Sequence, residues 1–249
     1  MDIFFIGVGD ACDPDYGNTS VHLVTDNQVS ILFDCGFSVP HSYFAFCTDP
    51  DQLDLVWISH FHGDHYFGLP LLLLRFWEMG RSKSLLLTGQ SGIADRVYAT
   101  MDMAFPGFMK KLCYEIQFQE IEPDGTREMV GLTFQTVETI HSQRNLGVLV
   151  SDGAKKFYYS GDGRPSDGVV EIVKDCDFAI HEAFRLNDEF PYHGSIAGCL
   201  ELFDKCAIKN LALVHLDRSF RKEQLAEIKE IINSNSSVIL PVQGTRITV

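Results

Sequence analysis

The chain has 249 residues, of which 45% are hydrophobic, and carries a formal net charge of −14. This length and composition allow it to bury a sizeable core. The acidic balance is a poor electrostatic footprint for long nucleic acids, which bind clustered Lys and Arg, so no partner of that kind is expected.

The first half of the chain predicts strands with helices between them. Apolar runs bounded by turn residues indicate strands at 3–8, 20–25, 29–34, 54–59 and 83–89. Apolar periodicity predicts one helix over 66–80, which ends at a glycine, and another over 92–105, which ends before Pro106.

The second half returns to strands and then alternates them with helices. Residues 113–162 predict two strand pairs, with hairpin turns at EPDGT (122–126) and DGAK (152–155). Helices are predicted near 167–174, 195–206 and 221–233, and strands at 177–183, 210–216, 237–241 and 245–249. Because no linker or low-complexity tract interrupts this order, we expect one α/β domain over residues 1–249, with two sheets between helices.

The seven cysteines are scattered, and none forms a Cys-x-x-Cys pair. An odd count without such pairs favours reduced thiols over a disulfide framework. No apolar stretch approaches the ~20 residues of a membrane span, and no basic residue precedes the short apolar run near the N-terminus. We therefore expect a cytoplasmic protein without a membrane partner.

One short motif, HFHGDH (residues 60–65), carries the strongest chemical signal. It directly follows the apolar strand LDLVWIS. Residues i and i+2 of an extended segment point the same way, so His60 and His62 can hold one cation together. Gly63 is expected to let the backbone turn sharply, which places Asp64 and His65 at the start of a helix, facing a second cation.

Three further residues of ligand type lie where apolar strands end. His141 follows FQTVETI, Asp162 follows KFYYSG and His215 follows NLALV. Strand ends converge on one edge of a sheet, where α/β proteins usually place their sites. With the first motif, these residues complete two coordination shells.

Together these motifs resemble the metallo-β-lactamase superfamily, whose mark is His-x-His-x-Asp-His. Within it, the chain resembles the transfer-RNA 3′-end nucleases (RNase Z) and their phosphodiesterase relatives. The motifs that carry this finer resemblance are DCG (34–36), SGDGRP (160–165), HEAF (181–184), YHGS (192–195) and LVHLDRSF (213–220). The resemblance runs nearly end to end and implies a four-layer αββα sandwich.

The resemblance also implies two metal sites and a mechanism. One metal would take His60, His62, His141 and Asp162, and the other Asp64, His65, His215 and the shared Asp162. A hydroxide bridging the metals would be the nucleophile. The catalytic residues implied beside it are Asp64, His193, which acts at the leaving group, and Glu182 close by. Asp34 is expected to accept a hydrogen bond that orients a ligand.

The ligands offer nitrogen and oxygen only, which suits two Zn²⁺ ions and also tolerates Mn²⁺ or Fe²⁺. Four metal charges, less two carboxylates and a hydroxide, leave about +1 at the site. A small anionic ester can therefore bind despite the overall charge. Family members often dimerise, so a homodimer is a possible partner by analogy, although the sequence does not reveal the oligomeric state.

Two departures from the RNase Z pattern point to a small or cyclic phosphodiester as the substrate. The stretch after DCG reads FSVPHSYF and lacks the acidic and glutamine-bearing residues of that branch. The basic arm that grips transfer RNA would lie between His141 and Asp162, yet these are only 21 positions apart. Alternatives that remain are a thioester or lactone hydrolase of the same fold, an RNase Z-like nuclease, and a non-catalytic sensor.

Overall fold

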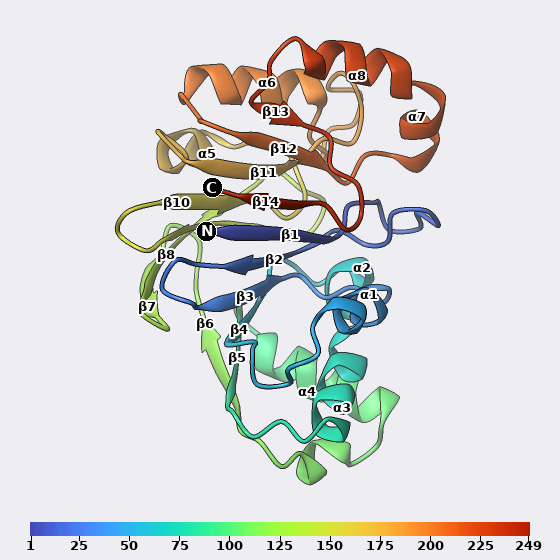
Figure 1. Cartoon of the computed structure of the whole chain (residues 1–249), viewed down its shortest axis with the longest axis vertical. Coiled ribbons are helices and arrows are strands. Elements are labelled where there is room, and N and C mark those ends of the chain that lie inside the picture. The colour runs from blue at the N-terminus through green and yellow to red at the C-terminus, as the bar shows by residue number, and fades with distance from the viewer.

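Two seven-stranded sheets pack face to face, and helices cover both outer faces (Figure 1). The computed structural model describes residues 1–249. This arrangement confirms the αββα sandwich that the motifs imply. The two termini lie side by side, because the last strand pairs with the first.

The first sheet has the order β14-β1-β2-β3-β4-β5-β6. It is antiparallel from β14 to β3 and parallel from β3 to β6. Its strands are β1 (Asp2–Gly7), β2 (Ser20–Val24), β3 (Ser30–Phe33), β4 (Leu55–Ile58), β5 (Leu85–Gly89), β6 (Ile116–Glu120) and β14 (Arg246–Thr248).

The second sheet repeats this plan with the order β13-β12-β11-β10-β9-β8-β7. It is antiparallel from β7 to β10 and parallel from β10 to β13. Its strands are β7 (Thr126–Met129), β8 (Leu132–Glu138), β9 (Leu146–Ser151), β10 (Lys156–Tyr159), β11 (Phe178–Glu182), β12 (Leu211–Val214) and β13 (Val238–Ile239).

The helices divide between the two outer faces (Figure 1). Those beside the first sheet are α1 (Val39–Phe46), α2 (Gly63–Tyr66), α3 (Leu69–Glu78), α4 (Ile93–Ala104) and the 3-10 turn η1 (Phe108–Lys111). Those beside the second sheet are α5 (Asp167–Ile172), α6 (Ile196–Lys205), α7 (Arg218–Glu223) and α8 (Leu225–Asn233). None of these helices combines the length and apolar character that crossing a bilayer requires.

Successive residues of a strand point to opposite faces of the sheet, and in the inner strands both faces are buried by apolar contacts. On β1, Ile3 and Phe5 enter the core between the sheets, whereas Phe4 and Ile6 face the helices. On β10, Phe157 and Tyr159 face the same central core, whereas Tyr158 packs under the helices of the second sheet. The inner strands of each sheet are thus buried on both sides, which holds their ends in fixed positions.

The predicted hairpin at EPDGT is wrong. Residues 121–125 cross from β6 in the first sheet to β7 in the second, so no hairpin turns there. The hairpin lies one strand later, where Met129 pairs with Leu132. Val130 and Gly131 form its two-residue turn with φ of +48° and +77°. A β-branched residue is a rare choice at positive φ, so the turn signal was weak there.

Two predicted helices are divided in the structure. The segment 66–80 belongs to α2 and α3, which are separated at Phe67 and Gly68. The charged helix predicted over 221–233 is α7 followed by α8. It begins earlier than predicted because the Asp217 side chain caps the backbone N–H of Phe220 at 2.7 Å.

Candidate metal centre and catalytic pair

The seven predicted metal ligands meet at one edge of the two sheets. His60 and His62 follow β4, and Asp64 and His65 lie in α2. The other three follow strands of the second sheet: His141 after β8, Asp162 after β10 and His215 after β12. The carboxyl ends of β8, β10 and β12 point the same way, and the packing of the sheets brings them against the end of β4.

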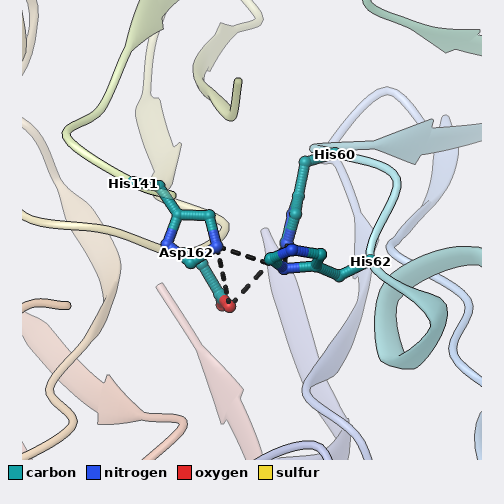
Figure 2. Close-up of side chains that lie close together, drawn as sticks. All are labelled: His60, His62, His141 and Asp162. Atoms are coloured by element: carbon teal, nitrogen blue, oxygen red, sulfur yellow. Dashed lines mark hydrogen bonds and ion pairs between the residues drawn. The ribbon is translucent and has the colours of Figure 1, made fainter. Parts of the chain in front are cut away.

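The first cluster contains His60, His62, His141 and Asp162, whose side chains converge on one point (Figure 2). Nε2 of His60 lies 2.9 Å from Nδ1 of His62, which in turn lies 3.2 Å from Nε2 of His141. Oδ2 of Asp162 lies 3.8 Å from Nε2 of His60 and 3.9 Å from that of His141. Ligands around one tetrahedral ion are separated by roughly 3.3–3.6 Å, so these spacings suit a single cation.

The second cluster contains Asp64, His65, Asp162 and His215. Nε2 of His65 lies 3.3 Å from a carboxylate oxygen of both Asp64 and Asp162. Nε2 of His215 lies 3.4 Å and 3.6 Å from the same two groups. Asp162 directs Oδ1 to this cluster and Oδ2 to the first, so one carboxylate serves both.

Hydrogen bonds on the far side of three imidazoles orient the ligand nitrogens. Nδ1 of His65 donates to Asp34 at 2.7 Å, and Nδ1 of His141 donates to the carbonyl of Tyr192 at 2.8 Å. Nδ1 of His60 donates to Oγ of Ser59 at 3.0 Å, because that hydroxyl donates onward to Asp34. Each Nε2 therefore faces its cluster.

These residues fit a pair of divalent cations. The Nε2 atom of His65 and Oδ1 of Asp162 are buried without a hydrogen-bond partner, a costly state unless a ligand satisfies them. Burial lowers the pKa of His65 and His215, yet the charge of Asp162 raises both well above the ordinary value. The cluster thus favours positive charge, which a bound cation supplies.

A third group adjoins the second cluster and contains the predicted pair Glu182 and His193. Nδ1 of His193 donates to Oε1 of Glu182, whose other oxygen accepts from the backbone of Gly163. The His193 ring stacks on Phe184, with centroids 4.4 Å apart. Glu182 is fully buried, whereas the side chain of His193 is 26% exposed, so this imidazole can meet a substrate from solvent.

The local role predicted for Gly63 is wrong. Its backbone has no positive φ, and the chain enters α2 there without an unusual turn. A Cβ at this position would lie 2.6 Å from the ring of Phe67. Because the Phe67 side chain is 51% exposed and its ring can shift, neither backbone freedom nor packing requires a glycine here.

Sequence reasoning missed several residues that contact the predicted ligands, their partner Asp34 or His193, among them Ser59, Tyr159, Phe184 and Tyr192. A buried tyrosine hydroxyl usually has a hydrogen-bond partner, and this tendency was the one feature of the sequence that could have indicated the role of Tyr159. The adjacent Tyr158 carries the same signal, so the sequence alone could not choose between them.

Gly36 is required because the backbone of Asp64 lies too close to it for any side chain to fit. A Cβ there would lie 1.8 Å from the backbone oxygen of Asp64. We expect Gly36→Ala to displace Asp64, to cost about 1–3 kcal/mol of folding stability as overpacking does, and to weaken metal binding. Thermal unfolding and metal titration measure both effects. Gly153→Ala is the control, because it strains an exposed turn with open space around it and should leave metal binding unchanged.

Comparison with known proteins places this chain in a family. The family model described as "Anti-Pycsar protein Apyc1" matches residues 1–232. The ribonuclease Z of Listeria monocytogenes is 31% identical over an alignment of 297 positions, gaps included, that covers 94% of this chain and 95% of that protein. The ribonuclease Z of Methanosarcina acetivorans is 23% identical and covers 88% of each chain.

Solved structures share the fold over the whole chain. The short form of human tRNase Z superposes with a TM-score of 0.81 at 21% identity, covering 100% of this chain and 99% of that one. The metallo-β-lactamase fold protein YhfI of Bacillus subtilis gives 0.80 at 20% identity, covering 99% and 98%. With its buried His/Asp cluster, the chain is a metal-dependent hydrolase of the metallo-β-lactamase fold, and it belongs to the Anti-Pycsar protein Apyc1 family.

Proposed function

We propose that this protein is a phosphodiesterase that hydrolyses a small cyclic nucleotide with two bound metal ions. The observation that carries the proposal is the His193–Glu182 pair, which adjoins the ligand cluster and is accessible from solvent. The matched family, whose description names an anti-Pycsar protein, supports a cyclic nucleotide as the substrate.

The ligand assignment is part of this proposal. One Zn²⁺ would be held by His60, His62, His141 and Asp162, and the other by Asp64, His65, Asp162 and His215. Bound cations of this kind lower the pKa of water to around 7 and polarise the phosphoryl group. The charge of two such cations exceeds that of the two carboxylates, so an anionic ester is attracted locally although the chain as a whole is acidic.

His193 is the proposed proton donor to the leaving oxygen. Burial lowers its pKa, but the hydrogen bond and charge of Glu182 raise it above the ordinary value. Burial and Asp162 raise the pKa of Glu182, yet the hydrogen bond from His193 and the imidazole of His215, 3.7 Å away, hold it below the ordinary value. Glu182 thus stays ionised and keeps a proton on His193, which can pass from Nε2 to an alkoxide.

This acid favours phosphodiesters over the thioester alternative. Opening a cyclic nucleotide expels a sugar alkoxide, a poor leaving group that needs a proton. A thioester expels a thiol with an ordinary pKa of about 8.5, which leaves readily without one. A buried Glu182 dedicated to His193 is therefore better matched to phosphodiester cleavage than to thioester cleavage, and the substrate panel below decides between a phosphodiester and a lactone.

A small substrate agrees with the connection between β9 and β10. Ser151 of β9 pairs with Lys156 of β10, and Val148 pairs with Tyr159. The connection between the two strands is therefore a turn of four residues, 152–155, which leaves no room for an RNA-binding arm. The Listeria ribonuclease Z aligns over 297 positions, more than the 249 residues of this chain, so it contains segments that this chain lacks.

A substrate panel on metal-quantified protein tests the proposal. It would contain cyclic pyrimidine and purine nucleotides, bis(p-nitrophenyl) phosphate, precursor transfer RNA, a thioester and a lactone. We expect cyclic nucleotides to be opened with the highest kcat/KM. Turnover of the thioester or lactone alone would refute phosphodiesterase activity, and a preference for precursor transfer RNA would favour the ribonuclease Z-like alternative.

A further inference from the structure

The carboxylate of Asp34, at the end of β3, accepts four hydrogen bonds in a fully buried position. The backbone and hydroxyl of Ser59 donate at 2.7 Å and 2.8 Å. Nδ1 of His65 donates at 2.7 Å and the hydroxyl of Tyr159 at 2.8 Å. One anion thus connects the loop after β4, helix α2 and the second sheet.

We propose that Ser59 and Tyr159 are positioning residues for the two cation sites and act through Asp34. Ser59 would serve the first cluster through His60, and Tyr159 the second cluster through His65. The inference rests on the metal sites of the proposed function, but it does not depend on the substrate.

Ser59 completes a directed chain of hydrogen bonds. Its hydroxyl has one proton, which goes to Oδ2 of Asp34 at 2.8 Å. The same oxygen must therefore accept the Nδ1 proton of His60 at 3.0 Å. This arrangement fixes the tautomer of His60 with its Nε2 lone pair toward the first cluster.

Tyr159 reaches Asp34 from the opposite sheet. It lies on β10, three residues before Asp162, and its ring packs against Phe33 with centroids 5.3 Å apart. Burial and the neighbouring Asp34 raise the pKa of its hydroxyl well above the ordinary value, so it remains a donor. The bond ties the carboxylate that orients His65 to the strand that delivers Asp162.

Tyr158 provides a matched control. It precedes Tyr159 on the same strand and is equally buried, but it faces the helices of the second sheet. Its hydroxyl has no hydrogen-bond partner. Removing this hydroxyl changes the same number of atoms in the same strand without touching Asp34.

The experiment measures the affinity of each Zn²⁺ by chelator competition, together with the unfolding temperature of metal-free protein. His60→Ala and His65→Ala identify which binding step belongs to which cluster. We expect Tyr159→Phe to weaken the second site about 10–100-fold, the usual effect of losing a supporting hydrogen bond. Ser59→Ala should weaken the first site by a similar factor, and Tyr158→Phe should match the parent at both.

Three outcomes would overturn the inference. In the first, both Tyr159→Phe and Ser59→Ala bind Zn²⁺ as tightly as the parent. In the second, Tyr158→Phe weakens Zn²⁺ binding as much as Tyr159→Phe does, and in the third, Tyr159→Phe and Ser59→Ala lower only the unfolding temperature of the metal-free protein and leave both affinities unchanged. If Tyr159→Phe does not fold, the affinities of Ser59→Ala alone test the inference, because replacing the small side chain of Ser59 leaves the packing of the sheets in place. Failure of cyclic nucleotide turnover with these affinity changes intact would count against the proposed substrate only.

Discussion

Asp162→Ala is expected to abolish the binding of both cations and with it all turnover. The two carboxylate oxygens face different clusters, Oδ1 toward His65 and His215 and Oδ2 toward His60 and His141. Burial raises the pKa of this carboxyl, but the charges of His215 and His65 hold it well below the ordinary value, so it is an anion at neutral pH. Its removal leaves clustered imidazoles without their shared counter-charge.

Metal analysis of the purified variant checks this result, with hydrolysis of bis(p-nitrophenyl) phosphate as a second measurement. We expect fewer than one cation per chain, since each cluster loses a ligand. Asp10→Ala is the control, because Asp10 is also a buried carboxylate but pairs with Arg218 outside both clusters. Two cations still bound to Asp162→Ala would show that this carboxylate does not bridge the sites.

His193→Ala should keep both cations and lose rate according to the leaving group. A general acid contributes about 10²–10⁴-fold, so we expect a fall of that size for a substrate with an alkoxide leaving group. The rate on bis(p-nitrophenyl) phosphate should fall far less, because p-nitrophenolate leaves without a proton. Metal content should stay at the parent value, since His193 belongs to neither of the two proposed ligand sets.

Kinetics on the two substrate types test this directly. His41→Ala is the matched control, because His41 is an exposed imidazole on α1 outside every cluster. Equal losses on both substrates would argue against a proton-donating role. Loss of metal in His193→Ala would instead make this residue a ligand, which the closeness of Asp162 and His215 to it allows in principle.

The order of the elements could be read well from local patterns. Apolar runs predicted the inner strands of both sheets, because these strands are buried on both faces and are nearly continuous apolar segments. The crossover at 121–125 was not predictable in this way. A turn signal such as Pro123–Asp124–Gly125 reports a change of direction, but not the sheet in which the next strand pairs.

The candidate site, like the fold, was predicted in part by local sequence patterns and in part not. The composition and spacing of HFHGDH, and the His or Asp residues after three apolar strands, determined which side chains would gather, since strand ends in an α/β fold share an edge. The ligand and catalytic roles of these residues stay predictions until metal and kinetics are measured. Local patterns contained no information on Ser59 or Tyr159, whose roles depend on contacts across 25 and 125 positions of sequence.

By itself, the sequence determined the strand and helix pattern and the chemical types of the ligands, because both depend on short-range periodicity and on residue identity. Only the tertiary structure decided that one oxygen of Asp162 faces each cluster, that Glu182 holds His193, and that Tyr159 rather than Tyr158 reaches Asp34. Those outcomes are set by how two sheets pack against each other, and no local stretch of chain contains that information.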